Sequence, residues 1–466
     1  MTRDSSSCAG ASLRALPARE RPARPPSVVA VPAIRAVLAV LAVLAVLACG
    51  GAAAARAQGL PPGRPEQLGF SPERLGRIDS LLRRYVDSGR VAGAVTLVAR
   101  HGRVAHVGAY GWSDREAGRR MSADAVFRIA SQTKALTSVA VMMLVEEGRL
   151  RLADPVSRWL PGFAAAAVAQ AADTGLARVP ARRPITIRDL LTHTAGISYG
   201  TDSLVQALYR AAGLGPAAGY GWYFADKTEP ICASMDRLGA LPFVAQPGER
   251  FVYGYNTDIL GCVVERVSGC SLDDFLQARL FGPLRMRDTR FFLPAELRDR
   301  LAAVYAANDR GGYVRADGGP RGQGAYVDGP GASFSGGAGL LSTAGDYARF
   351  LQMLLNGGVL EGERVLAPAT VALMTRNHVG ALYDRTGASG FGLGFEVLLD
   401  PGLAGQYGSA GRFGWGGAYA TNYWVDPDRD LVAVFMVQLL PSGGLDLADR
   451  FRTLVYQAVV DREVRP

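Results

Sequence analysis

The stretch that decides the fold is FRIASQTKALTSVAVMMLVEEGRL, residues 127–150. After SQTK (131–134) the chain continues with eleven almost uniformly apolar residues, 135–145, and the pattern stops at Gly148. A helix that is apolar on all sides belongs in a protein interior. The sequence therefore predicts a buried helix that opens at Ser131 and ends at the surface.

Ser131 and Lys134 are three residues apart, so both side chains project from one face of the first turn. Burial penalises a charged ammonium, and a neutral amine could accept the serine proton. The unpaired N–H groups at the helix start could stabilise an oxyanion. Alternatively, Ser131 only caps the helix and Lys134 extends to solvent. The chain has two lysines, Lys134 and Lys227, against 49 arginines, which favours a task for Lys134 that arginine cannot perform.

Composition excludes several classes of protein. The 466 residues are 49% hydrophobic and 20% charged, which is an ordinary globular composition with room for two or three domains. The net charge of +9 is concentrated in residues 1–57, and the other 409 residues carry only +4. That excess is too small to predict a nucleic-acid partner. The four histidines and five cysteines have no zinc-site spacing, so we expect no metal and no cofactor.

The N-terminus has the features of an export signal. Residues 36–48, AVLAVLAVLAVLA, form an apolar run of 13 residues, which is too short to span a membrane as a helix. Residues 55–57, ARA, then supply a cleavage pattern. We predict that residues 1–57 direct export to the periplasm or the medium. Alternatively, Cys49 ends a lipobox and is acylated. No later run resembles a transmembrane segment.

Three cysteines follow this segment, namely Cys232, Cys262 and Cys270. Their number is odd and their spacing matches no disulfide framework, so at most one disulfide is possible. Free cysteines are among the most buried residue types, and we expect three buried thiols.

Hydrophobic patterning places strands at both ends of the remaining chain. Residues 93–100 and 103–111 are expected to form one antiparallel hairpin, and 418–426 with 431–438 a second. An N-terminal helix begins at SPE (71–73), with a serine cap and proline in the first turn. Between these ends the pattern is mostly helical, with short helices expected at 188–193, 257–267, 272–280 and 344–356, and a last helix near 447–459.

This pattern predicts an α/β (α+β) fold, in which one antiparallel sheet is built from both chain ends and flanked by helices. The sheet domain is expected to comprise 58–130 and 335–466. Residues 131–334 would form an inserted, mainly helical domain, with the Ser131 helix at the interface.

Taken together, the motifs resemble those of the serine β-lactamase-like superfamily, which includes class C β-lactamases, D,D-peptidases and family VIII carboxylesterases. Besides 127–150, the resemblance is carried by LLTHTAGIS at 190–198 and GGAGLLSTAGDYARFLQMLLNGG at 336–358. It extends over roughly 68–460 and implies a β-lactamase/transpeptidase-like fold.

The family's second motif is Y-x-N, whose tyrosine partners the lysine. Here PGERFVYGYNTDILG (247–261) aligns Tyr253 with that tyrosine and puts Tyr255 in place of the asparagine. Tyr255 as the base is a second possibility, and either tyrosine could instead be a core aromatic residue.

The third family motif, K-T-G, is missing, because no lysine follows Lys227. WGGA (415–418) takes its place, at the expected start of a strand. The resemblance implies that the Ala418 N–H is the second oxyanion donor beside that of Ser131. Trp415 is expected as a pocket wall or an interface aromatic residue. Trp415, Gly416, Gly417 and Tyr255 are the candidate substrate contacts.

The resemblance is closest to family VIII carboxylesterases, so we expect an exported serine hydrolase that cleaves small esters. Ser131 would attack the carbonyl and form an acyl-enzyme, while Lys134 and Tyr253 share the acid–base work. Alternatives on the same fold are a D,D-peptidase or a β-lactamase, and an alternative of another class is a non-catalytic peptidoglycan sensor. GISYG (196–200) also spells a nucleophile elbow around Ser198, but no strand leads into it.

Overall fold

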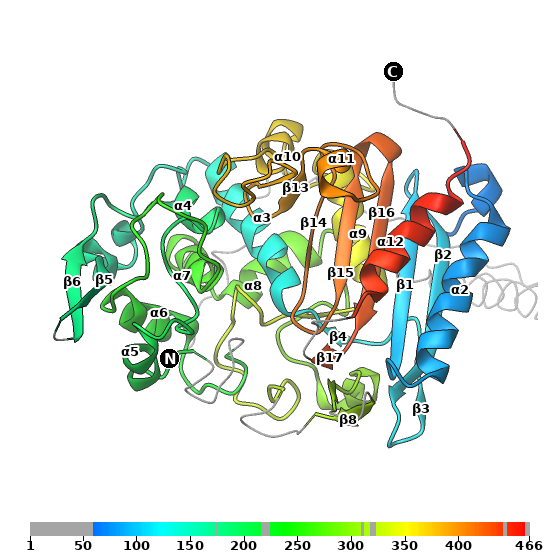
Figure 1. Ribbon diagram of the computed structural model, residues 1–466, viewed down its shortest axis with the longest axis horizontal. Coiled ribbons are helices and arrows are strands. Elements are labelled where there is room, and N and C mark those ends of the chain that lie inside the picture. The colour runs from blue at the N-terminus through cyan, green and yellow to red at the C-terminus, as the bar shows by residue number, and fades with distance from the viewer. Residues whose placement is uncertain are drawn as a thin grey trace, which may run out of the picture. The chain divides into compact units, whose positions relative to one another are not determined.

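The largest element of the fold is an eight-stranded antiparallel sheet whose strands come from both ends of the chain (Figure 1). The two halves join where β1 pairs with β16, from Ala94 opposite Val437 to Arg100 opposite Leu431. The predicted fold class is therefore confirmed. In sheet order the strands are β12 (Ser389–Phe391), β13 (Glu396–Leu398), β14 (Phe413–Gly416), β15 (Asn422–Asp426), β16 (Leu431–Val437), β1 (Gly93–Arg100), β2 (Arg103–Asp114) and β3 (Arg119–Arg120).

This computed structural model describes residues 59–173, 175–215, 224–308, 312–316, 323–440 and 445–461. The predicted export segment 1–57, with Cys49, lies outside the described residues. Within them, no helix is both long and apolar enough to cross a bilayer.

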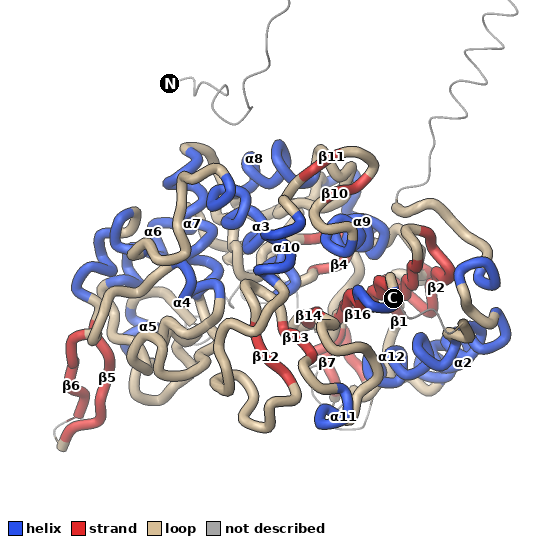
Figure 2. The backbone as a smooth tube through the Cα atoms, turned by 90° about the horizontal axis from the view of Figure 1, so that it is seen from above, coloured by secondary structure: helices blue, strands red, loops and turns tan. Residues whose placement is uncertain are grey.

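Helices cover both faces of the sheet (Figure 2). On one face lie α2 (Pro72–Asp87) and α12 (Leu447–Ala458), and on the other lies α9 (Ala344–Leu355). Successive side chains of a strand point to opposite faces. Ala94 and Val98 of β1 accordingly pack with α2 and α12, whereas Val95 and Leu97 join the core on the α9 side.

The remaining helices are mostly those between the two halves of the sheet. They are α3 (Thr133–Glu146), α4 (Ile187–Leu191), α5 (Gln206–Ala211), α6 (Ile231–Gly239), α7 (Asn256–Ser268), α8 (Leu272–Leu276), α10 (Pro368–Met374) and α11 (Pro401–Ala404). Short strand pairs and a small three-stranded sheet complete the described part of the fold. The pairs are β4 (Phe127–Arg128) with β9 (Leu341–Ser342), β5 (Ala167–Ala172) with β6 (Gly175–Pro180), and β10 (Val359–Leu360) with β11 (Glu363–Arg364). The three-stranded sheet has the order β17 (Leu439–Leu440), β7 (Tyr305–Ala307), β8 (Tyr313–Arg315).

The helix expected at Ser131 is buried as predicted, and every residue from Thr133 to Leu144 is buried. Its start differs, because 130–132 form a 3₁₀ turn and α3 begins at Thr133. Ser131 therefore lies in the turn that leads into the helix, and α3 packs against α7.

The start expected for one strand was wrong. The strand expected at 418–426 begins at Asn422, because Gly417 N donates to Thr421 O in a turn. The WGGA segment thus follows the end of β14 and does not open a strand. The helix expected at 272–280 is present as α8 up to Leu276 and then as a π-helical turn over Gln277–Phe281. The region expected to be mainly helical also contains the β5–β6 hairpin.

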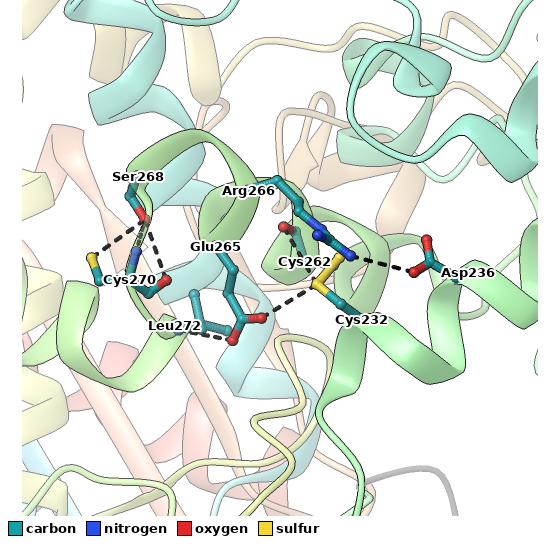
Figure 3. Close-up of a disulfide and its surroundings, with 8 residues drawn as sticks. All are labelled: Cys232, Asp236, Cys262, Glu265, Arg266, Ser268, Cys270 and Leu272. Atoms are coloured by element: carbon teal, nitrogen blue, oxygen red, sulfur yellow. Dashed lines mark hydrogen bonds and ion pairs between the residues drawn. A yellow bond between two sulfur atoms is a disulfide. The ribbon is translucent and has the colours of Figure 1, made fainter. Parts of the chain in front are cut away.

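A disulfide joins α6 to α7 through Cys232 and Cys262 (Figure 3). Their Cα atoms are 5.1 Å apart although the residues are separated by 30 positions in the chain. The expectation of three thiols was therefore wrong for this pair. The two cysteines meet because α6 packs against α7, and the spacing of cysteines in the sequence cannot predict how two helices pack.

Replacing both Cys232 and Cys262 by alanine should lower the free energy of unfolding by about 3 kcal/mol, because the bond restricts a loop of this length in the unfolded chain. Urea unfolding followed by circular dichroism measures the loss. Reductant should lower the urea concentration at the unfolding midpoint of the wild type toward that of the double variant. The midpoint of the double variant itself should not change. Equal midpoints for oxidised wild type and variant would contradict this role.

Candidate active site

The turn before α3 brings the predicted nucleophile to the predicted lysine. Ala130 has a φ of +43°, a left-handed conformation that is costly for a residue with a side chain. The chain turns there, leaving Ser131 half-buried. Lys134, in the first turn of α3, is 2% exposed, and its Nζ donates to Ser131 Oγ at 3.2 Å.

The Lys134 ammonium has three acceptors, one for each of its N–H groups. Besides Ser131 Oγ, they are Tyr199 Oη at 2.9 Å and Gly337 O at 2.7 Å. The ring of Tyr253 lies with its centroid 4.7 Å from Nζ. Buried charges need such partners, so these contacts hold the amine beside the serine.

The structure brings Tyr253 into this group. Its hydroxyl accepts a hydrogen bond from Trp415 Nε1 at 3.1 Å, which links the segment before α7 to the end of β14. Tyr255 lies elsewhere. It is fully buried, and its hydroxyl accepts from Gly215 N at 2.7 Å. Its placement is that of a core aromatic residue, so the structure does not bring it to Ser131 as a substrate contact.

Sequence reasoning missed Tyr199. It belongs to the same GISYG stretch in which Ser198 attracted attention, but Tyr199 is the residue that reaches Lys134. Ser198 is buried, its Oγ accepts from Gly200 N at 3.1 Å, and no strand precedes it. Burial, and then the neighbouring Tyr253, raise the pKa of Tyr199 well above its usual value. Tyr199 therefore stays a neutral phenol at ordinary pH.

His193 and Asn256 hold the segment that carries Tyr253. His193 O accepts from Val252 N at 2.7 Å, and its Nδ1 lies 2.9 Å from Asn256 Nδ2. Burial, followed by the charge of Lys134, lowers the pKa of His193 well below its usual value. The imidazole is thus neutral, and it packs against the Tyr253 ring at a centroid distance of 4.7 Å.

Gly417 allows the WGGA segment to lie against the turn that carries Ser131. A Cβ on Gly417 would stand 2.5 Å from Ile129 O and 2.2 Å from Thr421 Oγ1, which no side chain could tolerate without movement. Because Gly417 lies against Ile129, the next residue, Ala418, belongs to the segment that faces the turn containing Ser131. Ala418 is half-buried. This is the side of the site where the second oxyanion donor was predicted.

Aromatic rings surround Trp415, with centroids at 5.6 Å for Tyr253, 5.3 Å for Phe391 and 6.4 Å for Tyr383. Trp415 is therefore both a contact of Tyr253 and part of an aromatic wall. Among the described residues, no group of three or more histidine, cysteine or acidic side chains is arranged to hold a metal ion.

Comparisons with known proteins agree with this geometry. The family model "Beta-lactamase" matches residues 78–457. The chain is 37% identical over 383 residues to Protein Rv1367c of Mycobacterium tuberculosis, covering 79% of this chain and 90% of that protein. It is 35% identical over 381 residues to Esterase EstB of Burkholderia gladioli, covering 79% and 91%.

Among solved structures, EstCE1, described as a hydrolase with promiscuous acyltransferase activity, matches with a TM-score of 0.70 and 30% identity over 82% of this chain and 99% of that one. Neighbours of lower identity include a penicillin-binding protein homologue from Caulobacter crescentus at 21%, with a TM-score of 0.61, which shares the fold. The chain therefore belongs to the beta-lactamase family and is a serine hydrolase related to its esterases.

Proposed function

We propose that the protein hydrolyses small neutral carboxylic esters through an acyl-enzyme on Ser131. The observation that carries the proposal is the contact between Lys134 Nζ and Ser131 Oγ, made by a buried amine with two further fixed partners. A serine hydroxyl is a weak nucleophile until a neighbouring base removes its proton. The esterase relatives support this reading.

In the proposed reaction Ser131 Oγ attacks the ester carbonyl while its proton passes to the Lys134–Tyr253 pair. The N–H groups of Ser131 and Ala418 stabilise the tetrahedral oxyanion. The oxyanion collapses, the bond to the alkoxy oxygen breaks, and the same pair returns the proton to the departing alcohol. Water then attacks the acyl-enzyme with the same assistance and releases the acid.

The two phenols near Lys134 differ in what they can do. Tyr199 stays neutral and accepts a hydrogen bond from the amine, so it anchors Lys134. Tyr253 accepts from the Trp415 indole, which fixes its ring beside the Lys134 amine. We assign proton transfer to Tyr253 and anchoring to Tyr199.

The substrate class follows from the missing cation. In relatives that process lactams, the K-T-G lysine meets the substrate carboxylate, as the resemblance implies. Here Trp415 and its aromatic neighbours occupy that edge. Arg412, the arginine nearest in sequence, is buried and directs its guanidinium to Tyr407 O and Gln406 Oε1. The aromatic wall around Trp415 suits a neutral ester.

The same observations weigh against the alternatives. A D,D-peptidase or a β-lactamase must bind a carboxylate, and a sensor has no need for Lys134 to be fixed beside Ser131. Export through residues 1–57 is part of this proposal and places the activity outside the cytoplasm.

Replacing Ser131 by alanine should abolish ester hydrolysis and labelling by a fluorophosphonate, because the attacking oxygen is lost. Mapping the labelled peptide of the wild type should give the tryptic fragment with Ser131. Ser198→Ala is the matched control and should keep both properties. Labelling that survives in Ser131→Ala and disappears in Ser198→Ala would refute the assignment.

Replacing Gly417 by alanine should lower kcat by about 10²-fold, as expected when one oxyanion donor is displaced. The added methyl group must push the WGGA segment away from Ile129 O. Gly416→Ala is the comparison, because its Cβ would meet Thr421 O only at 3.2 Å, and we expect a smaller loss. Steady-state kinetics of both variants, with melting temperatures to verify folding, decide the point. Equal losses would show that the approach at Gly417 has no special role.

Neutral p-nitrophenyl esters should be cleaved with a kcat/KM at least about 10²-fold above that of a matched ester with a free carboxylate on its acyl chain. A carboxylate left without a partner costs about 3 kcal/mol. The pair to compare is a p-nitrophenyl ester of succinate and its methyl-capped form. A chromogenic cephalosporin and a D-Ala-D-Ala peptide should be poorer still. A preference for the charged member would show that a cation serves this site.

A further inference from the structure

A buried carboxylate is linked to the Lys134 amine through Gly337. Asp258, in the first turn of α7, is fully buried. Its Oδ1 accepts hydrogen bonds from Ser335 Oγ at 2.5 Å and from Gly337 N at 3.1 Å. Its Oδ2 has no hydrogen-bond partner within the described residues. An acidic group with so few partners is costly to bury, so a compensating interaction is expected nearby.

Gly337 connects this carboxylate to Lys134. Its N–H donates to Asp258, and its carbonyl oxygen accepts from Lys134 Nζ at 2.7 Å. The position requires glycine, because a Cβ there would stand 2.4 Å from Asp258 Oδ2. Thr137 Oγ1 of α3 also donates to Gly336 O at 2.8 Å, which fixes the preceding residue. Asp258 and Lys134 are thus held on either side of one backbone segment.

The charges of the two groups act on each other. Burial raises the pKa of Asp258 to about 6, while the charge of Lys134 and the hydrogen bonds from Ser335 and Gly337 oppose that rise. Above pH 6 the carboxylate is therefore ionised. It is then a negative charge close to the amine, in a region from which water is excluded.

Among the described residues, the other titratable groups that act on this pair come from two segments. Tyr199 and His193 approach from the segment after α4, and Tyr253 and Tyr255 from the segment before α7. His193 is neutral, as described above. Burial raises the pKa values of Tyr199 and Tyr255, and the charge of Asp258 contributes to both rises. Asp258 is therefore the anionic member of this group.

We propose that Asp258 is a positioning residue for the reaction, whose carboxylate holds Gly337 against Lys134 and whose charge sets the pH at which the Ser131–Lys134–Tyr253 group loses its essential proton. The proposal rests on the proposed function. Asp258 is fully buried and is linked to Lys134 through Gly337, so it acts through Lys134 and does not touch the substrate.

The direction of the effect follows from electrostatics. A nearby negative charge stabilises an ammonium and destabilises a phenolate. Removing it favours loss of a proton, whether that proton leaves the Lys134 ammonium or the Tyr253 hydroxyl. The acid limb of the kcat/KM profile reports the group of the free enzyme that must be deprotonated. Without the charge of Asp258, this limb must move to lower pH.

The test compares Asp258→Asn with wild type over pH 5–10, using kcat/KM for p-nitrophenyl butyrate followed at a pH-independent wavelength. Asparagine keeps the shape and the acceptor oxygen but removes the charge. We expect the acid limb to move down by about one pH unit, with KM at the optimum unchanged. A displaced Gly337 would add a loss of kcat.

Asp346 supplies a matched control. It is also buried with a pKa raised by burial to about 6, but its Oδ2 accepts from Asp288 N at 2.8 Å and from Thr289 Oγ1 at 3.0 Å, away from Lys134. Asp346→Asn should lower stability and leave the acid limb in place. If Asp258 had a purely structural role, Asp258→Asn would likewise lower stability and leave the acid limb in place.

A folded Asp258→Asn variant whose acid limb coincides with that of wild type would overturn the proposal. If that variant does not fold, Ser335→Ala replaces it, because loss of the Ser335 donor weakens the ionised form of Asp258. Its limb should move in the same direction by less, and a coincident limb would again overturn the proposal. Fluorophosphonate labelling at Ser131 in wild type separates this failure from a failure of the proposed function.

Discussion

The fold around the site depends on one constraint, the burial of the Lys134 amine. A lysine that is 2% exposed is tolerated only where acceptors are fixed around it. The three acceptors come from separate parts of the chain, namely the turn before α3, the segment after α4, and Gly337 ahead of α9. In this fold, the burial of Lys134 brings these three segments together. Their meeting point is also the site that we propose for ester hydrolysis.

A chain of contacts between aromatic residues connects the buried amine to the sheet. Tyr253 lies over the amine, Trp415 donates to Tyr253, and Phe391 and Tyr383 pack around Trp415. The strands β12 and β14 are thereby tied to the helical region through ring contacts and one hydrogen bond. This wall gives the proposed site an apolar side next to the buried amine.

Local patterns predicted the parts of the site that are local. Ser131 and Lys134 are three residues apart, and this spacing, the buried helix and the scarcity of lysine together predicted their contact. The sheet from both ends followed from two alternating hairpins. Tyr253 needed the family motif as well. Tyr199 is 65 residues from Lys134 in sequence, and Gly337 is 203 away. Only tertiary packing brings them together, so no spacing could have indicated them. The short strand β14, FGWG, has no alternating pattern, which explains why WGGA was assigned to the wrong strand.

The pairing of β1 with β16 has a consequence for biosynthesis. These central strands are separated by more than three hundred residues, from Arg100 to Leu431. Contacts of such sequence separation form late and slow the folding of a chain. When synthesis has reached α3, β16, which pairs with β1, has not yet been made. An unpaired, apolar strand edge of this kind promotes aggregation. The nascent chain therefore has a long interval in which its first hairpin lacks its main neighbour, a period in which a chaperone or a secretion factor can keep it unfolded.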